Sequence, residues 1–224
     1  MELKGNKMNT DLMEVLLGDT AGEATMQLAD PSLLQYYQRI AEREYLLDYE
    51  ISSCINEIIQ WIRYWNREDA KKRVSVENRR PITLLLDTPG GDAMEGLTLY
   101  STMKASKTPI RVVVLGECAS AGMLVLAGAT PGQRFAMAGS SLLIHEGYTA
   151  VSNSSGKTKD TVEYYNKLDK QYKDSLIANS NITPELFEKN ERIEWWLNAQ
   201  EALELGLVDH IVADLDEIAG IDDE

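Results

Sequence analysis

The chain contains few of the residues that build metal centres and disulfide frameworks. Two of its 224 residues are cysteines and two are histidines. Cys54 and Cys118 lack the spacing of metal ligands, so we expect two small buried side chains, with no disulfide and no metal. The glycine-containing turn at 89–91 has neither a GxGxxG pattern nor a Walker lysine, which argues against phosphate binding. We therefore expect no cofactor.

Positive charge is also scarce. The chain has 22 Lys and Arg against 36 Asp and Glu, giving a net charge of -14. This balance argues against nucleic acid and anionic membranes as partners. The longest apolar stretch, 112–129, is interrupted by Glu117, Ser120 and glycines, so we expect a strand followed by a helix rather than a membrane span. No charged-then-apolar leader precedes a cleavage-like site, and we expect a cytoplasmic protein.

The length and composition fit one α/β domain with a substantial core. Hydrophobic residues make up 44% of the chain, as in an ordinary soluble protein. We expect a polar, mobile N-terminal segment at 1–31, a single domain over 32–215 and an acidic C-terminal tail at 216–224.

The most informative segment is 116–122 (GECASAG), which contains Ser120. The apolar run 110–115 before it predicts a buried strand, and the small aliphatic run 123–129 after it predicts a buried helix. A serine at such a junction has its hydroxyl beside free backbone N–H groups, which a developing oxyanion requires. The alternative is a helix N-cap serine, and this segment alone leaves both interpretations open.

A second junction lies at 82–92 (ITLLLDTPGGD). The run 82–86 predicts a strand buried on both faces, and 93–103 has the apolar spacing of a helix. Paired glycines between them let the backbone approach a ligand closely, with one N–H pointing outward. A simple strand–helix turn is the alternative.

His145 ends the apolar stretch in 140–146 (SSLLIHE). The other histidine, His210, is flanked by apolar residues that indicate a late strand with His210 facing solvent. A histidine at a strand end is often structural. For a Ser-His mechanism, however, His145 is the candidate base.

The segment 192–209 (RIEWWLNAQEALELGLVD) contains Glu194 at the edge of an aromatic patch. Asn198 to Glu201 resembles a capping box that opens a short helix, which stops at Gly206. Glu194 could be partly desolvated and orient an imidazole, or it could be a surface charge. The spacing alone does not decide.

Two further segments have helical periodicity. Apolar residues in 51–65 predict a core-facing amphipathic helix, followed by a charged connector at 67–80. The charged segment 157–178 carries tyrosines and leucines at three- and four-residue intervals, which predicts an amphipathic helix with one buried stripe.

Taken in order, these motifs resemble the proteolytic subunit of the Clp protease (ClpP) family, whose members are self-compartmentalising serine peptidases. The resembling segments are 88–91, 116–122, 143–145, 197–202 and 206–209, and the similarity runs from about 34 to about 212. The resemblance implies an α/β fold, a ClpP/crotonase-like spiral of repeated β-β-α units with a protruding handle helix at 157–178.

The resemblance also implies roles for individual residues. Ser120 corresponds to the nucleophile and His145 to the general base. Gly91 and Ala121 correspond to the residues whose N–H groups form the oxyanion hole; the family often has methionine at the position of Ala121. Glu194 stands where the family usually has the aspartate of the triad.

The glutamate is a departure with a physical cost. Its extra methylene displaces the carboxylate unless the backbone retreats, and a misplacement of roughly 1 Å can cost ~100-fold in rate. Either the local backbone has adapted or activity is weak. Asp160 and Glu191 are alternative candidates for the third member.

For assembly, the resemblance implies two stacked heptameric rings, joined through the handle helix and a strand at 147–152. It further implies unfolded proteins or peptides as substrates, and an AAA+ unfoldase of the Clp type that meets the N-terminal segments at the axial entrance.

Three other functions stay open. Glu194 would suit a catalytically silent ring subunit. A crotonase-like acyl-CoA enzyme shares the fold, although the serine and histidine disfavour it. A phage-type or translocation-associated peptidase of the same family would act without an unfoldase.

Overall fold

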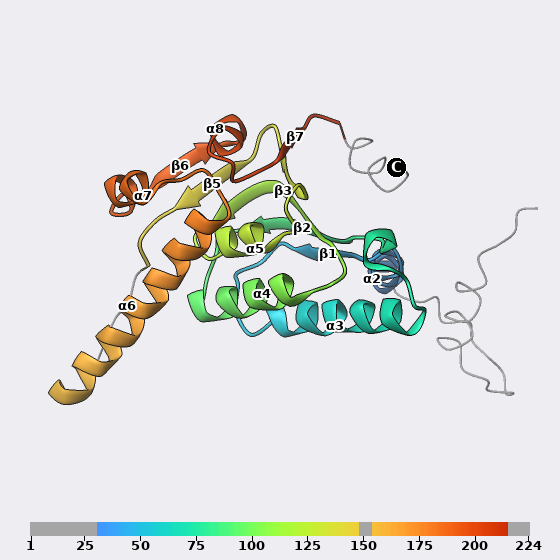
Figure 1. Cartoon of the computed structure of the whole chain (residues 1–224), viewed down its shortest axis with the longest axis horizontal. Helices are drawn as coiled ribbons and strands as arrows, with labels where there is room; N and C mark the ends of the chain where they lie inside the picture. Colours follow the sequence, from blue (N-terminus) through green and yellow to red (C-terminus); the bar gives the residue numbers. More distant parts are fainter. Residues whose placement is uncertain (1–30, 148–153, 215–224) are drawn as a thin grey trace, which may run out of the picture. The chain divides into compact units, whose positions relative to one another are not determined.

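The computed structural model describes residues 31–147 and 154–214 (Figure 1). By its internal contacts the chain divides into two units, Met1–Gln38 and Arg39–Glu224. The first unit is described only in part of α2 (Pro31–Ala41), where the rings of Tyr36 and Tyr37 meet edge to face. Apart from Pro31, the predicted N-terminal segment 1–31 lies outside the described residues, as does the tail at 216–224.

The second unit is built on a seven-stranded sheet in which most neighbours are parallel. The main path runs β1-β2-β3-β4-β7, and β5 and β6 continue from the far end of β3. The strands are β1 (Glu44–Leu47), β2 (Ile82–Thr88), β3 (Ile110–Ala119), β4 (Arg134–Met137), β5 (Ser141–Ile144), β6 (Trp195–Asn198) and β7 (His210–Val212). Continuous apolar runs in β2 and β3 are buried because helices cover this sheet.

The long strand β3 changes partners along its length. Its first half pairs with β4 through Val112 to Val114, and its last residues, Glu117 to Ala119, pair with β5. The antiparallel strand β6 then pairs with β5. The ends of β2, β3 and β5 therefore lie at neighbouring positions, and the predicted site residues follow these ends.

The helices of the second unit pack in sequence. They are α3 (Ile55–Lys71), α4 (Ala93–Ala105), α5 (Gly122–Gly128), α6 (Ser155–Ala178), α7 (Pro184–Asn190) and α8 (Ala199–Glu204), with a 3₁₀ turn η1 (Val76–Asn78). Figure 1 shows α3 and α4 side by side, with α5 between α4 and the strands. Every residue of α5 is buried, as expected of a helix hydrophobic on all sides.

The predicted α/β class is confirmed, and β4, β5 and α6 follow one another as a β-β-α unit. The strands predicted at 82–86 and 110–115 and the helices predicted at 93–103 and 123–129 correspond to β2, β3, α4 and α5. The predicted capping box is present: Asn198 and Glu201 cap each other's backbone at the start of α8, and Gly206 follows with a φ of 66°.

Two predictions about the segment around α3 are wrong. The helix begins at Ile55 and continues to Lys71, so 67–71, the first part of the predicted connector 67–80, is helical. Asp69 lies in this extension, is buried, and accepts hydrogen bonds from Arg43 (Nη1 to Oδ2, 2.9 Å) and Thr108 (2.8 Å). A polar residue thus belongs to the packed face of the helix.

Cys54 is the second correction, because it is exposed rather than buried. It is the N-cap residue of α3, and its Sγ lies 3.0 Å from the Ser52 hydroxyl. The buried positions of the helix begin only at Ile55. Cys118 is buried, as predicted, and both thiols are free.

The helix predicted at 157–178 is confirmed as α6. Its first buried side chain among those described is Leu168, and most side chains before it are exposed. Figure 1 shows this first half of α6 (orange) extending away from the sheet. The strand predicted at 147–152 lies outside the described residues except for Gly147.

Arg134 and Asp209 form an ion pair that connects the last strands to the ends of two helices. Arg134 of β4 contacts both carboxylate oxygens of Asp209, at 3.0 Å and 2.6 Å. Its remaining nitrogen donates to the carbonyls of Asn179 and Gly206, at the ends of α6 and α8. One guanidinium thereby joins four segments, using the fixed geometry of its donors.

Within the ranges that the structure describes, no helix is both long enough and apolar enough to cross a lipid bilayer.

Candidate active site

Ser120 occupies a strained turn between β3 and α5. Its φ is 54°, in the left-handed region that non-glycine residues seldom adopt. Its N–H donates to the carbonyl of Leu143 at 2.9 Å, and its carbonyl accepts from the N–H of Met123 at 3.0 Å. The N-cap residue of α5 is Ala121, with no side-chain cap. The interpretation of Ser120 as an N-cap serine is therefore wrong.

The two glycines after β2 lie against this turn. Gly90 has a φ of 95°, and a Cβ added to it would come within 2.6 Å of the Ser120 Cβ. Gly91 has a φ of 142°, and a Cβ there would meet the backbone of Ile51 at 2.2 Å. Both positions need glycine, for conformation and for space. The turn is thus more than a simple strand–helix connection.

The glycine segment is held from both sides. The N–H of Ile51 donates to the Gly90 carbonyl at 2.6 Å, and the N–H of Asp92 donates to the Ile51 carbonyl at 2.8 Å. The Thr88 hydroxyl donates to the Tyr49 carbonyl at 2.7 Å and accepts from the Gly90 N–H at 3.2 Å. The hydroxyl of Thr88 was not singled out by sequence reasoning, although its Thr-Pro-Gly-Gly context was.

Two amide N–H groups at these two turns take no part in the contacts described above. Within residues 31–147 and 154–214, neither the Gly91 N–H nor the Ala121 N–H donates to another residue. Backbone donors in packed regions nearly always have a partner, so such N–H groups are suited to receive a ligand oxygen. These are the two donors that the sequence analysis assigns to an oxyanion hole.

His145 and Glu194 meet across the β5–β6 ladder. Ile144 pairs with Trp195, and the next residues along this antiparallel register are His145 and Glu194. The Nδ1 of His145 lies 3.1 Å from Oε1 of Glu194. Because β5 is also bonded to the Ser120 N–H through Leu143, the imidazole follows a strand that touches the serine turn directly.

The Glu194 carboxylate is not desolvated, contrary to one possibility raised by its aromatic neighbours. In the single chain its side chain is 63% exposed, against 28% for His145. It is also more than a surface charge, since it contacts the imidazole. The alternative acids make other contacts. The Glu191 carboxylate is 3.8 Å from Lys173, although its backbone carbonyl accepts from the N–H of Glu146, and Asp160 is exposed on α6.

Burial also shifts the pKa of two other ionisable groups, one at the end of β3 and one on α6. It raises the pKa of the Cys118 thiol, with the charge of Glu117 adding to the effect. This thiol therefore stays neutral and is no rival to the Ser120 hydroxyl. Burial and the charge of Glu146 likewise raise the pKa of Asp169 on α6.

The contact of Tyr172 with the Ser120 turn was not predicted from the sequence. Tyr172 was recognised only as part of the buried stripe of α6, yet its hydroxyl donates to the Ser120 carbonyl at 3.2 Å. His210 is placed as predicted, exposed at the start of β7, with its ring stacked on Phe135. It belongs to a different part of the sheet from Ser120.

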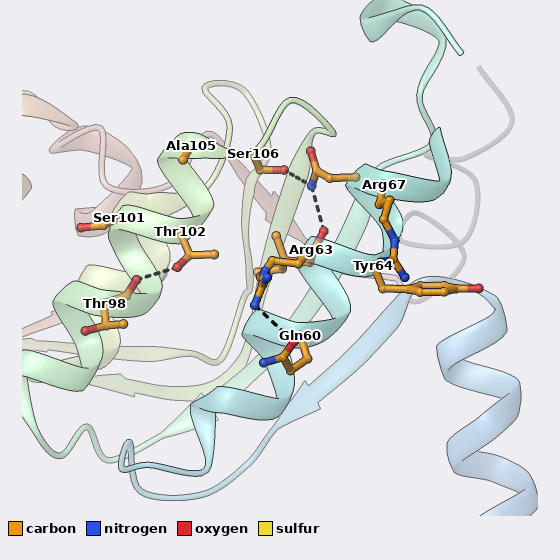
Figure 2. A pocket seen from close by; sticks show the side chains of 11 residues that line it. Gln60, Arg63, Tyr64, Arg67, Thr98, Ser101, Thr102, Ala105 and Ser106 are labelled. Carbon is orange, nitrogen blue, oxygen red and sulfur yellow. Dashed lines mark hydrogen bonds between the residues drawn. The ribbon is translucent and has the colours of Figure 1, made fainter. Parts of the chain in front are cut away.

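One pocket in the described part of the chain is separate from these residues. A pocket of about 820 Å³ lies between α3 and α4, and Figure 2 shows its lining of arginine, threonine and serine side chains. None of the predicted site residues lines it. Among the described residues, no group of three or more His, Cys, Asp and Glu side chains could hold a metal.

Comparison with known proteins identifies the family of the chain. The Clp protease family profile matches residues 35–214. A Clp protease proteolytic subunit 2 of Prochlorococcus marinus is 31% identical over 180 residues, covering 79% of this chain and 86% of that protein.

Two further relatives carry the same description. The subunit 2 of Nocardia farcinica is 25% identical over 203 residues, covering 90% of this chain and 95% of that protein. The subunit 2 of Corynebacterium efficiens is 29% identical over 133 residues, covering 59% of this chain and 67% of that protein. The chain belongs to the Clp protease family and is a serine peptidase of the ClpP type.

Proposed function

We propose that the chain is an endopeptidase in which Ser120, His145 and Glu194 form the catalytic triad, with Gly91 and Ala121 as oxyanion donors. The observation that carries this proposal is the meeting of three segments at one sheet end. The strained Ser120 turn touches Gly90 on one side and Leu143 on the other, two residues before the imidazole paired with Glu194.

The reaction is an acyl transfer in two halves. The Ser120 Oγ attacks the peptide carbonyl carbon while His145 accepts the hydroxyl proton. The C–N bond then breaks, and the same proton goes to the leaving amine. Water repeats the sequence on the acyl-enzyme, releasing the acid and restoring the serine.

Each supporting group has a separate task. The Gly91 and Ala121 N–H groups stabilise the oxyanion, and losing one such donor costs about 10²- to 10³-fold in turnover. The Glu194 carboxylate accepts from Nδ1 of His145, which selects the productive tautomer and stabilises the imidazolium. The ladder register lets a glutamate reach the imidazole from β6.

Membership of the family implies oligomeric rings that work with a Clp ATPase. We further propose two stacked heptamers in the cytoplasm, with α6 as the ring–ring contact and unfolded polypeptides or peptides as substrates. Support comes from the exposed first half of α6, where Val162 and Tyr164 are 44% and 45% exposed. An enclosed chamber lets an unspecific peptidase coexist with folded proteins.

The test is hydrolysis of a short fluorogenic peptide by size-fractionated protein, together with labelling by a fluorophosphonate. Ser120→Ala should reduce turnover by about 10⁶-fold and abolish labelling, without loss of folding or assembly. Ser101→Ala, an exposed serine of α4, is the matched control and should behave as wild type. Unchanged turnover in Ser120→Ala would end the assignment.

A catalytically silent ring subunit is the second candidate, favoured by the 63% exposure of Glu194. The same labelling experiment separates the two. An intact assembly in which Ser120 fails to react with the fluorophosphonate would establish the silent role.

A further inference from the structure

The orientation of one peptide plane decides whether the proposed oxyanion hole is formed. The Ser120 carbonyl and the Ala121 N–H belong to the same peptide unit, which is planar and rigid. In a trans peptide the carbonyl and the N–H point in opposite directions. Whatever fixes the Ser120 carbonyl therefore aims the Ala121 N–H.

Two groups hold that carbonyl. One is the Met123 N–H, 3.0 Å away in the first turn of α5. The other is the Tyr172 hydroxyl, 3.2 Å away on α6 and 52 residues distant in sequence. The left-handed φ of Ser120 is unfavourable for a serine, so this turn depends on such contacts to persist.

The side chain of Tyr172 is itself firmly placed. It packs with Tyr100 and Tyr165 against a buried cluster of Leu97, Leu124 and Leu168, contributed by α4, α5 and α6. Burial, and next the nearby Cys118, raise the pKa of the Tyr172 hydroxyl. The phenol therefore stays protonated, and remains a donor, at neutral and mildly alkaline pH.

We propose that Tyr172 is a positioning residue for the oxyanion hole: its hydroxyl holds the Ser120 carbonyl and thereby directs the Ala121 N–H toward the substrate. This role rests on the proposed function, since it has meaning only if Ser120 is the nucleophile. Tyr172 itself does not touch the reacting atoms.

The role has a kinetic signature. The oxyanion exists in the transition state and not in the bound substrate, so a misdirected donor lowers kcat and leaves KM nearly unchanged. Tyr172→Phe keeps the ring and its packing, and the Ser120 carbonyl keeps its bond from Met123. We expect kcat to fall about tenfold, less than for complete loss of a donor.

A tetrahedral adduct gives an independent measurement. A peptide boronic acid that binds Ser120 places a negative oxygen in the same hole, so its affinity should weaken by the same factor of about ten. Both effects should be constant from neutral to mildly alkaline pH, because the phenol does not titrate there.

Tyr165→Phe is the matched control, on the same helix and in the same cluster. It should match wild type in kcat, KM and boronate affinity. Thermal midpoint and particle size are measured for both variants.

The outcomes are distinct. A selective loss of kcat and boronate affinity in Tyr172→Phe, with midpoint and particle size retained, supports the inference. Wild-type kcat in Tyr172→Phe overturns it, as do equal losses of activity and stability in both tyrosine variants. If the wild-type protein neither reacts with the fluorophosphonate at Ser120 nor hydrolyses the peptide, the proposed function is wrong. That result does not depend on any Tyr172 variant.

Discussion

Glu194 contacts the imidazole of His145, which the proposed mechanism uses as the general base. A glutamate has one more methylene than the usual aspartate, yet its Oε1 is 3.1 Å from Nδ1 because the β5–β6 register places the two residues opposite each other. The glutamate therefore reaches the imidazole from this backbone position, and we expect the shorter aspartate to reach it less well.

Two substitutions at Glu194 test this argument. Glu194→Gln keeps the size and removes the charge that stabilises the imidazolium, so kcat should fall about 10³- to 10⁴-fold. Glu194→Asp keeps the charge and withdraws the oxygen by roughly 1 Å, so kcat should fall up to ~100-fold. Peptide hydrolysis at saturating substrate measures both.

Glu191→Gln is the control, because the Glu191 carboxylate lies 3.8 Å from Lys173. The backbone carbonyl of Glu191, which this substitution keeps, accepts from the N–H of Glu146. Full activity in Glu194→Gln, with loss in Glu191→Gln, would transfer the acid role to Glu191. If neither variant loses activity, a carboxylate has no part in the mechanism.

At the scale of elements, the Arg134–Asp209 pair is the contact that joins β4 to the chain before β7. Both side chains are largely buried, at 13% and 19% exposure. Burial by itself raises the pKa of Asp209, but hydrogen bonds and charge from Arg134 outweigh it and hold that pKa below its usual range. The ionised carboxylate is therefore favoured by folding.

Asp209→Asn should destabilise the protein by about 3 kcal/mol at neutral pH, because it leaves a buried guanidinium without its counter-charge. The stability from this pair is fully present above the unfolded pKa near 4 and is lost as pH falls through the lower folded value. The difference in the free energy of unfolding between Asp209→Asn and wild type should therefore be smaller in acid. Urea unfolding at pH near 7 and near 3, at fixed protomer concentration, measures this.

Asp174→Asn provides the comparison, since Asp174 pairs with Lys170 on the surface of α6, at 58% and 71% exposure. It should change stability little. If Asp209→Asn loses the same free energy of unfolding at both pH values, the explanation by the charge of Asp209 is wrong.

Local sequence patterns predicted most elements, because each depends on residues close in the chain. The runs in β2 and β3, the capping box at Asn198 and the periodicity of α6 are of this kind. The extension of α3 was missed, since burial of Asp69 depends on Arg43, 26 residues away. Tyr172 was missed for the same reason. Nothing near it in sequence indicates that its hydroxyl reaches Ser120.

At the scale of the whole molecule, the proposed double ring has a mass of about 350 kDa, fourteen times the 25.1 kDa chain. Val162→Asp places a charge on the exposed first half of α6 and should separate the particle into two rings of half that mass. Sedimentation velocity at micromolar concentration measures the change.

Val76→Asp, at a similarly exposed valine of η1, is the matched control and should leave the double ring intact. A wild-type protein that sediments as a monomer would contradict the assembly. An intact double ring in Val162→Asp would contradict the role of α6.

In the proposed assembly, helix formation in the exposed first half of α6 depends on the association of copies of the chain. Roughly a dozen helical residues with little packing beneath them are only marginally stable in water. If the proposed ring–ring contact forms here, a neighbouring copy would supply their order, and coil-to-helix conversion and association would form one thermodynamic equilibrium. Dilution would shift both together, and the helical content of the solution would depend on how much protein it holds.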